Sequence, residues 1–183
     1  MQDIEGALAV LQRAIHNEIV GQRFYDDAAR YCVDLWAKDV FASLAREEEE
    51  HTHLLLVEFQ ALKTQGHWID FEIARASAAE VDLSQISFPD DGSGEGFFPI
   101  QRPIGEIVDR RADDLAALAF GIRMEQEAIE LYGLQADTIE DPAGRETYRI
   151  LVQEEKRHYD ELRAQWEKLS GTAFEAARNG NEP

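Results

Sequence analysis

The chain carries one pattern of acidic and imidazole side chains twice. In each half a single glutamate precedes a Glu-x-x-His segment, and the second set stands 107 positions after the first. The six residues are Glu18, Glu48, His51, Glu125, Glu155 and His158. A glutamate on one helix and Glu-x-x-His on the next, present twice, is the arrangement with which four-helix bundles hold two metal ions. This feature therefore constrains the fold and the site together.

Apolar residues recur every three or four positions through four long segments. This is the period of a helix that buries one face. The predicted helices lie at approximately 3–32, 35–65, 113–140 and 142–170. Asp34 and Asp141 are suited to begin the second and fourth helices, because a short acidic side chain there accepts a hydrogen bond from a free backbone N–H. Gly66 fits the carboxyl end of the second helix.

The match between the halves extends to the apolar positions of the helices. The sequence therefore predicts an all-α, ferritin-like four-helix bundle, in which two antiparallel helical hairpins are related by a pseudo-twofold axis and joined by a long crossover. A single domain is expected at residues 1–171, with the crossover at 66–112 and a C-terminal tail at 172–183. Short helices are expected in the crossover near 72–81 and 104–111.

A net charge of −19 limits the range of partners. Such an acidic surface repels nucleic acid and anionic lipid, so neither is expected to bind. Cys32 is the only cysteine, which leaves no disulfide framework and no four-cysteine metal site. The first residues lack the pattern of a signal peptide, and no segment approaches the roughly 20 apolar residues of a membrane span. The cytoplasm is the expected location.

All six residues of the repeated pattern fall on the apolar stripes. A buried ionised carboxylate costs several kcal/mol unless it is paired or bound to metal, and these stripes carry no lysine or arginine. Two divalent cations would balance the four glutamates. Residues three apart are neighbours on a helix, so Glu-x-x-His offers an oxygen and an imidazole to one ion. These ligands suit two iron or manganese ions, with zinc as an alternative.

A competing pair with the same spacing, Glu50 and His53, lies in the same helix. Residue 50 is about 200° around the helix from residue 48 and is therefore off the stripe. The corresponding positions in the second half are Arg157 and Asp160, which do not repeat the ligands. We therefore exclude this pair as a metal site.

Four further residues lie close to the predicted ligands. Tyr25 and Tyr132 each stand seven positions after a ligand glutamate, on the same helix face. They are candidate catalytic residues if their hydroxyls bond to ligand carboxylates, and core residues otherwise. Glu47 and Glu154 each precede a ligand glutamate and are expected to lie at the surface.

With these residues in place, the chain resembles the rubrerythrin branch of the ferritin-like superfamily. The resembling segments are 17–25, 44–51, 124–132 and 154–158. The resemblance implies a di-iron centre that reacts with hydrogen peroxide or dioxygen while the iron cycles between ferrous and ferric. Rubrerythrins usually add a four-cysteine rubredoxin domain, so this chain would need a separate electron donor, such as a rubredoxin-like protein. Many members also carry a carboxylate at the position of Ala128, and its absence leaves six ligands.

The sequence thus predicts an oxidoreductase of the peroxidase or ferroxidase type with a carboxylate-bridged two-metal centre. One alternative is ferritin-like iron oxidation with storage or carriage, and another is a metal-free helical interaction module. Manganese in place of iron would favour a catalase-like reaction. A homodimer is expected because several apolar residues lie off the predicted stripes, namely Ile19, Val20, Phe24, Leu54 and Leu56.

Overall fold

A computed structural model of the chain describes residues 4–78 and 113–174. Its helices are α1 (Ile4–Tyr31), α2 (Leu35–Gln65), α3 (Phe71–Ala78), α5 (Asp113–Thr138) and α6 (Pro142–Ser170). No strand occurs in the two described ranges, which confirms the all-α prediction for them. The short helix expected near 104–111 and the tail from residue 175 lie outside the described residues. None of the described helices combines the length and apolar character that a membrane crossing requires.

Local contacts fix the ends of two long helices. Asp34 begins α2 and accepts a hydrogen bond from the Ala37 N–H at 2.8 Å. Asp141 begins α6 and accepts from the Ala143 N–H at 2.9 Å. Gly66 ends α2 with a left-handed φ of 75°, which glycine adopts without steric cost. The second helix of each hairpin therefore starts with the same capping residue.

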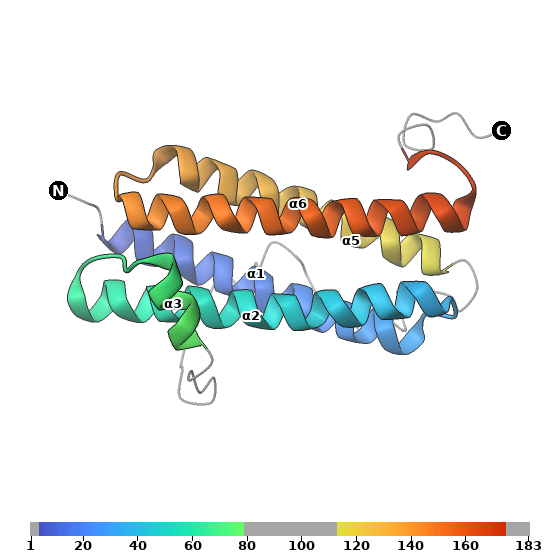
Figure 1. Cartoon of the computed structure of the whole chain (residues 1–183), viewed down its shortest axis with the longest axis horizontal. Coiled ribbons are helices and arrows are strands. Elements are labelled where there is room, and N and C mark those ends of the chain that lie inside the picture. Colours follow the sequence, from blue (N-terminus) through green and yellow to red (C-terminus); the bar gives the residue numbers. More distant parts are fainter. Residues whose placement is uncertain (1–3, 79–112, 175–183) are drawn as a thin grey trace.

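The long helices form two antiparallel hairpins that pack side by side (Figure 1). One hairpin pairs α1 with α2, and the other pairs α5 with α6. The Asp114 carboxylate of α5 connects them at one end, since it accepts hydrogen bonds from the backbone N–H groups of Val33 at 3.1 Å and Asp34 at 2.6 Å. The short helix α3 packs on α2 and places Phe71 and Ala74 in the core. The described residues thus form a helical bundle.

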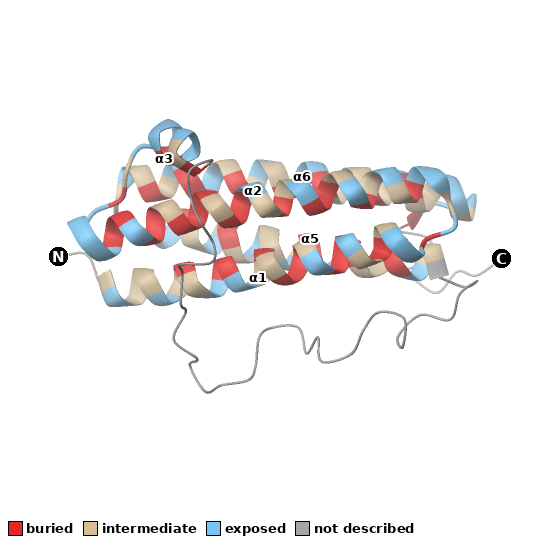
Figure 2. Ribbon diagram, turned by 90° about the horizontal axis from the view of Figure 1, so that it is seen from below, coloured by how far each residue is buried: buried red, intermediate tan, exposed pale blue. Residues whose placement is uncertain are grey.

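Buried residues occur along all four long helices (Figure 2), and the apolar ones form two clusters. One cluster takes the carboxyl half of α1 and the amino half of α2, and includes Phe24 and Phe41. The other takes the opposite halves and includes Leu11 and Leu55. Between them, each long helix carries one or two of the acidic and imidazole residues of the repeated pattern.

The apolar residues that suggested a dimer are mostly buried within the chain itself. Val20, Phe24, Leu54 and Leu56 are between 2% and 7% exposed. Leu54 and Leu56 belong to the same cluster as Phe71 of α3, so α2 has apolar neighbours on more than one face. These residues therefore give no support to a dimer interface, and the dimer stays a prediction.

Candidate metal centre

The six residues of the repeated pattern lie together in the middle of the bundle. They are Glu18 from α1, Glu48 and His51 from α2, Glu125 from α5, and Glu155 and His158 from α6. Their exposed fractions lie between 0% and 5%. Four carboxyl groups and two imidazoles are thus held away from water, where each needs a partner of opposite charge or a hydrogen bond.

The ligand atoms form two overlapping groups, each of which could hold one metal ion. Glu18 and His51 belong to the first group, Glu125 and His158 belong to the second, and Glu48 and Glu155 belong to both. Within each group the ligand atoms lie within 4.8 Å of one another. A carboxylate has two oxygens, so each shared glutamate can bridge two ions. The structure therefore offers two adjacent positions, each with three carboxylates and one imidazole.

Both histidines turn the Nδ1 atom toward the carboxylates. His51 Nδ1 lies 3.2 Å from Oε2 of Glu18 and 3.2 Å from Oε1 of Glu155. His158 Nδ1 lies 3.1 Å from Oε2 of Glu155 and 3.4 Å from Oε1 of Glu48. The two rings stack with their centroids 5.5 Å apart. The same nitrogen of each ring is therefore directed into the cluster.

The other nitrogen of each histidine binds a glutamate from the opposite hairpin. His51 Nε2 of α2 lies 2.9 Å from Oε2 of Glu154 on α6, and His158 Nε2 of α6 lies 3.3 Å from Oε2 of Glu47 on α2. These two glutamates, expected at the surface, are half-buried, with side chains 32% exposed for Glu154 and 24% exposed for Glu47. The feature of the sequence that could have revealed these contacts is that Glu47 and Glu154 occupy matching positions in the repeat. Such carboxylates fix the orientation of a ligand imidazole.

The two tyrosines also cross between the hairpins. The Tyr25 hydroxyl of α1 donates a hydrogen bond to Oε1 of Glu125 on α5, and the Tyr132 hydroxyl of α5 donates to Oε1 of Glu18 on α1. Both rings are fully buried. Burial and the nearby carboxylates raise the pKa of both tyrosines well above the usual value, so the hydroxyls keep their protons and act as donors.

Several groups of the cluster have raised pKa values and therefore favour a form that carries more positive charge. Burial raises the pKa of Glu48 and Glu125 well above the usual value, and the neighbouring carboxylates add to the shift. Burial alone would lower the pKa of His158, but hydrogen bonds with Glu155, Glu47 and Glu48 raise it to about 12. Glu48, Glu125 and His158 thus favour bound protons, and divalent cations compete with protons for the same atoms.

Glu155 supplies the most direct test of whether these residues fit a metal. Its carboxylate is buried, and its Oε1 atom lies 3.2 Å from Nδ1 of His51 without forming a hydrogen bond of good geometry. Burial opposes ionisation, but the charge of His51 and the hydrogen bond of His158 lower the pKa of Glu155 below the usual value. A buried, ionised oxygen of this kind calls for a cation. Donor type, burial and charge therefore all fit a two-metal centre.

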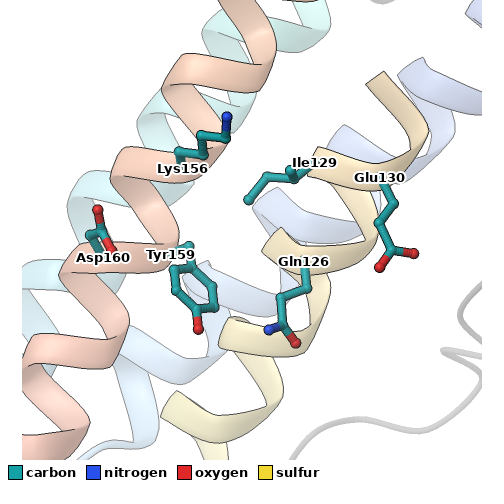
Figure 3. Close-up of a pocket in the computed structure, with 6 residues that line it drawn as sticks. All are labelled: Gln126, Ile129, Glu130, Lys156, Tyr159 and Asp160. Atoms are coloured by element: carbon teal, nitrogen blue, oxygen red, sulfur yellow. The ribbon is translucent and has the colours of Figure 1, made fainter. Parts of the chain in front are cut away.

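A surface pocket lies between α5 and α6 (Figure 3). The residues that line it are Gln126, Ile129, Glu130, Lys156, Tyr159 and Asp160. Gln126 and Lys156 directly follow the cluster residues Glu125 and Glu155 in the chain, yet the lining contains no member of the cluster. The pocket is therefore a neighbour of the candidate site and not a part of it.

No protein-family model, curated protein or solved structure matches the chain. The described residues form an all-helical bundle with a buried cluster of glutamate and histidine that could hold metal ions. All six residues predicted from the repeat come together in that cluster. Sequence reasoning missed the contacts of Glu47, Glu154 and Arg157 with it.

Proposed function

We propose that the protein is a di-iron redox protein, similar to rubrerythrin, that reduces hydrogen peroxide or reacts with dioxygen. The observation that carries this proposal is that Glu48 and Glu155 belong to both groups of ligand atoms, because shared carboxylates hold two ions close enough to act together. Two ferrous ions held by these residues would supply the two electrons that, together with two protons from the solvent, convert hydrogen peroxide into two water molecules. A separate electron donor, such as a rubredoxin-like protein, returns the electrons.

We also propose that the bundle is ferritin-like. The support for this fold is that contacts repeat between the two halves of the chain: Tyr25 binds Glu125, and Tyr132 binds Glu18 in the same way. Such reciprocal contacts are those of two hairpins related by a pseudo-twofold axis. The crossover between α3 and α5 spans residues 79–112, which lie outside the described residues.

In this proposal, apolar residues around the site exclude water, and polar residues around it orient the ligands. Leu11 and Leu55 on one side, and Phe24 and Phe41 on the other, belong to the apolar clusters that flank the six ligands and exclude water. The two tyrosine hydroxyls hold the outer carboxylates, and the two crossed glutamates hold the imidazoles. These partners leave the ligands little freedom to reorient, which is what a preorganised site requires.

Iron fits the donors best, with manganese and zinc as competitors. Carboxylate-rich sites with one imidazole per ion suit iron or manganese, whereas zinc sites more often contain cysteine or several histidines. Ala128 stands at the position where many rubrerythrins carry a further carboxylate, and it is partly buried against an apolar cluster. We therefore propose a centre with six protein ligands, located in a cytoplasmic protein.

Iron storage or carriage is a second candidate, favoured by the net charge of −19, which attracts ferrous ions to the surface. Storage as a mineral needs a hollow assembly of many chains. Gel filtration distinguishes the two functions, since a large cage supports storage and a dimer supports redox chemistry.

Elemental analysis of anaerobically loaded protein tests the proposed function. We expect two irons per chain in the natural protein, and the loss of stoichiometric binding in Glu48→Ala and in Glu155→Ala, because each substitution removes a ligand of both ions. Loaded protein should consume hydrogen peroxide with oxidation of both irons, as followed by absorbance. A parallel challenge with dioxygen identifies the preferred oxidant.

Glu50→Ala is the matched control for this experiment. Glu50 lies on the same helix as Glu48, is exposed, and has the competing spacing with His53. We expect this variant to bind two irons. Retention of both irons by Glu48→Ala, or a natural protein that binds no metal, would contradict the proposal, and the second result would favour a helical interaction module.

A further inference from the structure

The two crossed histidine–glutamate pairs differ in one contact. Glu47 is bound both by His158 and by Arg157, whose guanidinium also donates to Glu161 at 3.1 Å. The position that corresponds to Arg157 in the first half of the chain is Glu50, an exposed acidic residue. The repeat that makes the two metal positions alike is therefore broken at this point.

The histidine–glutamate distances of the two pairs also differ. Oε2 of Glu154 lies 2.9 Å from Nε2 of His51. The corresponding Oε2 of Glu47 lies 3.3 Å from Nε2 of His158, and this same oxygen accepts the hydrogen bond from Nη2 of Arg157. One oxygen thus serves two donors on one side of the cluster, whereas the oxygen on the other side binds the imidazole more closely.

Arg157 also places a positive charge beside the second histidine. Its Nη2 atom lies 3.4 Å from Nε2 of His158. At Glu154 the charge of Arg75 of α3 also acts, but its effect on the pKa of this glutamate is smaller than that of His51. Both the shared acceptor and the added charge act at His158 and its glutamate.

A carboxylate on the far nitrogen of an imidazole makes the ring a stronger metal ligand and holds its orientation. A guanidinium that neutralises this carboxylate weakens the effect, and its charge also repels a divalent cation at the near nitrogen. Both effects disfavour the metal position that contains His158. The outer ligands Glu18 and Glu125 are alike in their tyrosine contacts, because each accepts a hydrogen bond from a tyrosine hydroxyl.

We propose that the two metal positions are unequal, and that the position formed by His51, Glu18 and the two shared glutamates fills first because Arg157 weakens the other. Arg157 is then a positioning residue that acts through Glu47 and not a ligand. The inference rests on the proposed two-metal centre and adds an order of filling to it. A chain with ordered filling holds one ion firmly and takes up the second at higher metal concentration.

Zinc titration of the metal-free protein, labelled with ¹⁵N in its histidines, tests the order directly. Zinc is diamagnetic, so the imidazole ¹⁵N signals report which ring is coordinated. The first equivalent should move the Nδ1 signal of His51 and the second that of His158. Calorimetry should resolve two dissociation constants that differ by about tenfold or more, the lower end of the 10–100-fold effect of such outer partners.

Two variants of Arg157 separate charge from packing. Arg157→Gln should bring the two dissociation constants within about threefold of each other, since an unshared Glu47 then resembles Glu154. Arg157→Lys keeps the charge and should keep the order of filling. Arg163→Gln is the matched control, because Arg163 lies on the same helix and pairs with Glu167 four residues on, as Arg157 pairs with Glu161. It should leave both constants unchanged.

Simultaneous movement of the two histidine signals, or movement of His158 first, would overturn the inference. So would an unchanged difference between the two constants in Arg157→Gln. These results leave the proposed function intact, because two ions still bind. A natural protein that binds fewer than two zinc ions contradicts the two-metal centre itself, and the inference falls with it.

Discussion

Tyr25 and Tyr132 each connect a buried ring in one hairpin to a carboxylate of the other. Their hydroxyls remain protonated because burial and nearby negative charge raise the pKa of both. Each hydroxyl satisfies a buried carboxyl oxygen that would be costly to leave without a hydrogen bond. At the scale of the single residue, one hydroxyl therefore both positions a ligand and ties the two hairpins together.

Replacement of Tyr132 by phenylalanine should lower the free energy of unfolding of the metal-free protein by about 1–3 kcal/mol, because it removes the donor to the buried Glu18 carboxylate. Urea unfolding measures the change. Tyr148→Phe is the control: its ring stacks on Tyr132 at 5.9 Å and is equally buried, but its hydroxyl has no hydrogen-bond partner among the described residues. Equal losses in the two variants would assign no role to the Tyr132 hydroxyl.

Glu58 is a buried carboxyl outside the metal cluster. It accepts hydrogen bonds from the Thr147 hydroxyl at 3.0 Å and the Ile69 N–H at 3.2 Å. Burial is the main reason that its pKa rises to about 7. The folded protein therefore binds this proton more tightly than the unfolded chain does. The resulting stability is fully present below the unfolded pKa, near 4.5, and is lost as pH rises through 7.

Glu58→Gln should remove this pH dependence. The difference in unfolding free energy between the natural protein and the variant should change by about 2–3 kcal/mol between pH 4.5 and pH 8, in the direction of a less stable natural protein at high pH. Urea unfolding at several pH values measures it. Glutamine already occupies the corresponding position of the repeat, Gln165, where it donates to Asp34 at 2.8 Å. A pH-independent difference would show that Glu58 titrates normally in the fold.

At the scale of the helix, the sequence was sufficient to predict the features that depend on interactions between residues close together in the chain. The apolar stripes predicted the long helices, and Asp34, Asp141 and Gly66 lie at helix ends, as their side chains and backbone preferences predict. The cluster was also predictable, because helical spacing alone puts Glu48 and His51 on one face. These features depend on residues close together in the chain.

The contacts that were missed depend on how one helix faces another. Glu47 and Glu154 sit one position before a ligand glutamate, and in an isolated helix this position points about 100° away from the ligand face. Only the packing of α2 against α6 brings each of them to a histidine of the opposite hairpin. Leu54 and Leu56 were misjudged for the same reason, since the position of α3 was not predictable from the periodicity of α2.

At the scale of the whole molecule, the cluster is a polar connection between the hairpins. Hydrogen-bonded pairs that cross between them there include Tyr25 with Glu125, Tyr132 with Glu18, His51 with Glu154, and His158 with Glu47, and Arg157 adds a further bond to Glu47. Metal ions bound at the shared glutamates would add further links. Metal occupancy should therefore control how firmly the two hairpins hold together.

Metal loading should raise the unfolding temperature of the natural protein. An ion that binds only the folded state, at a free concentration of 100 times its dissociation constant, adds about 2.7 kcal/mol to the free energy of unfolding. Thermal unfolding with and without manganese measures the shift, and a chelator should reverse it. Glu155→Ala removes a shared ligand and should abolish the shift. The same shift in this variant would place the stabilising ions elsewhere on the acidic surface.

The single arginine beside one histidine has a consequence for how such a chain can evolve. Two separate copies of one hairpin could assemble a comparable cluster around a twofold axis, but every substitution would then appear on both sides. Joining the copies in one polypeptide removes that restriction. Position 157 could become arginine while its counterpart, position 50, is glutamate. A single polypeptide that carries both sites thus permits two neighbouring sites of similar design to differ from each other.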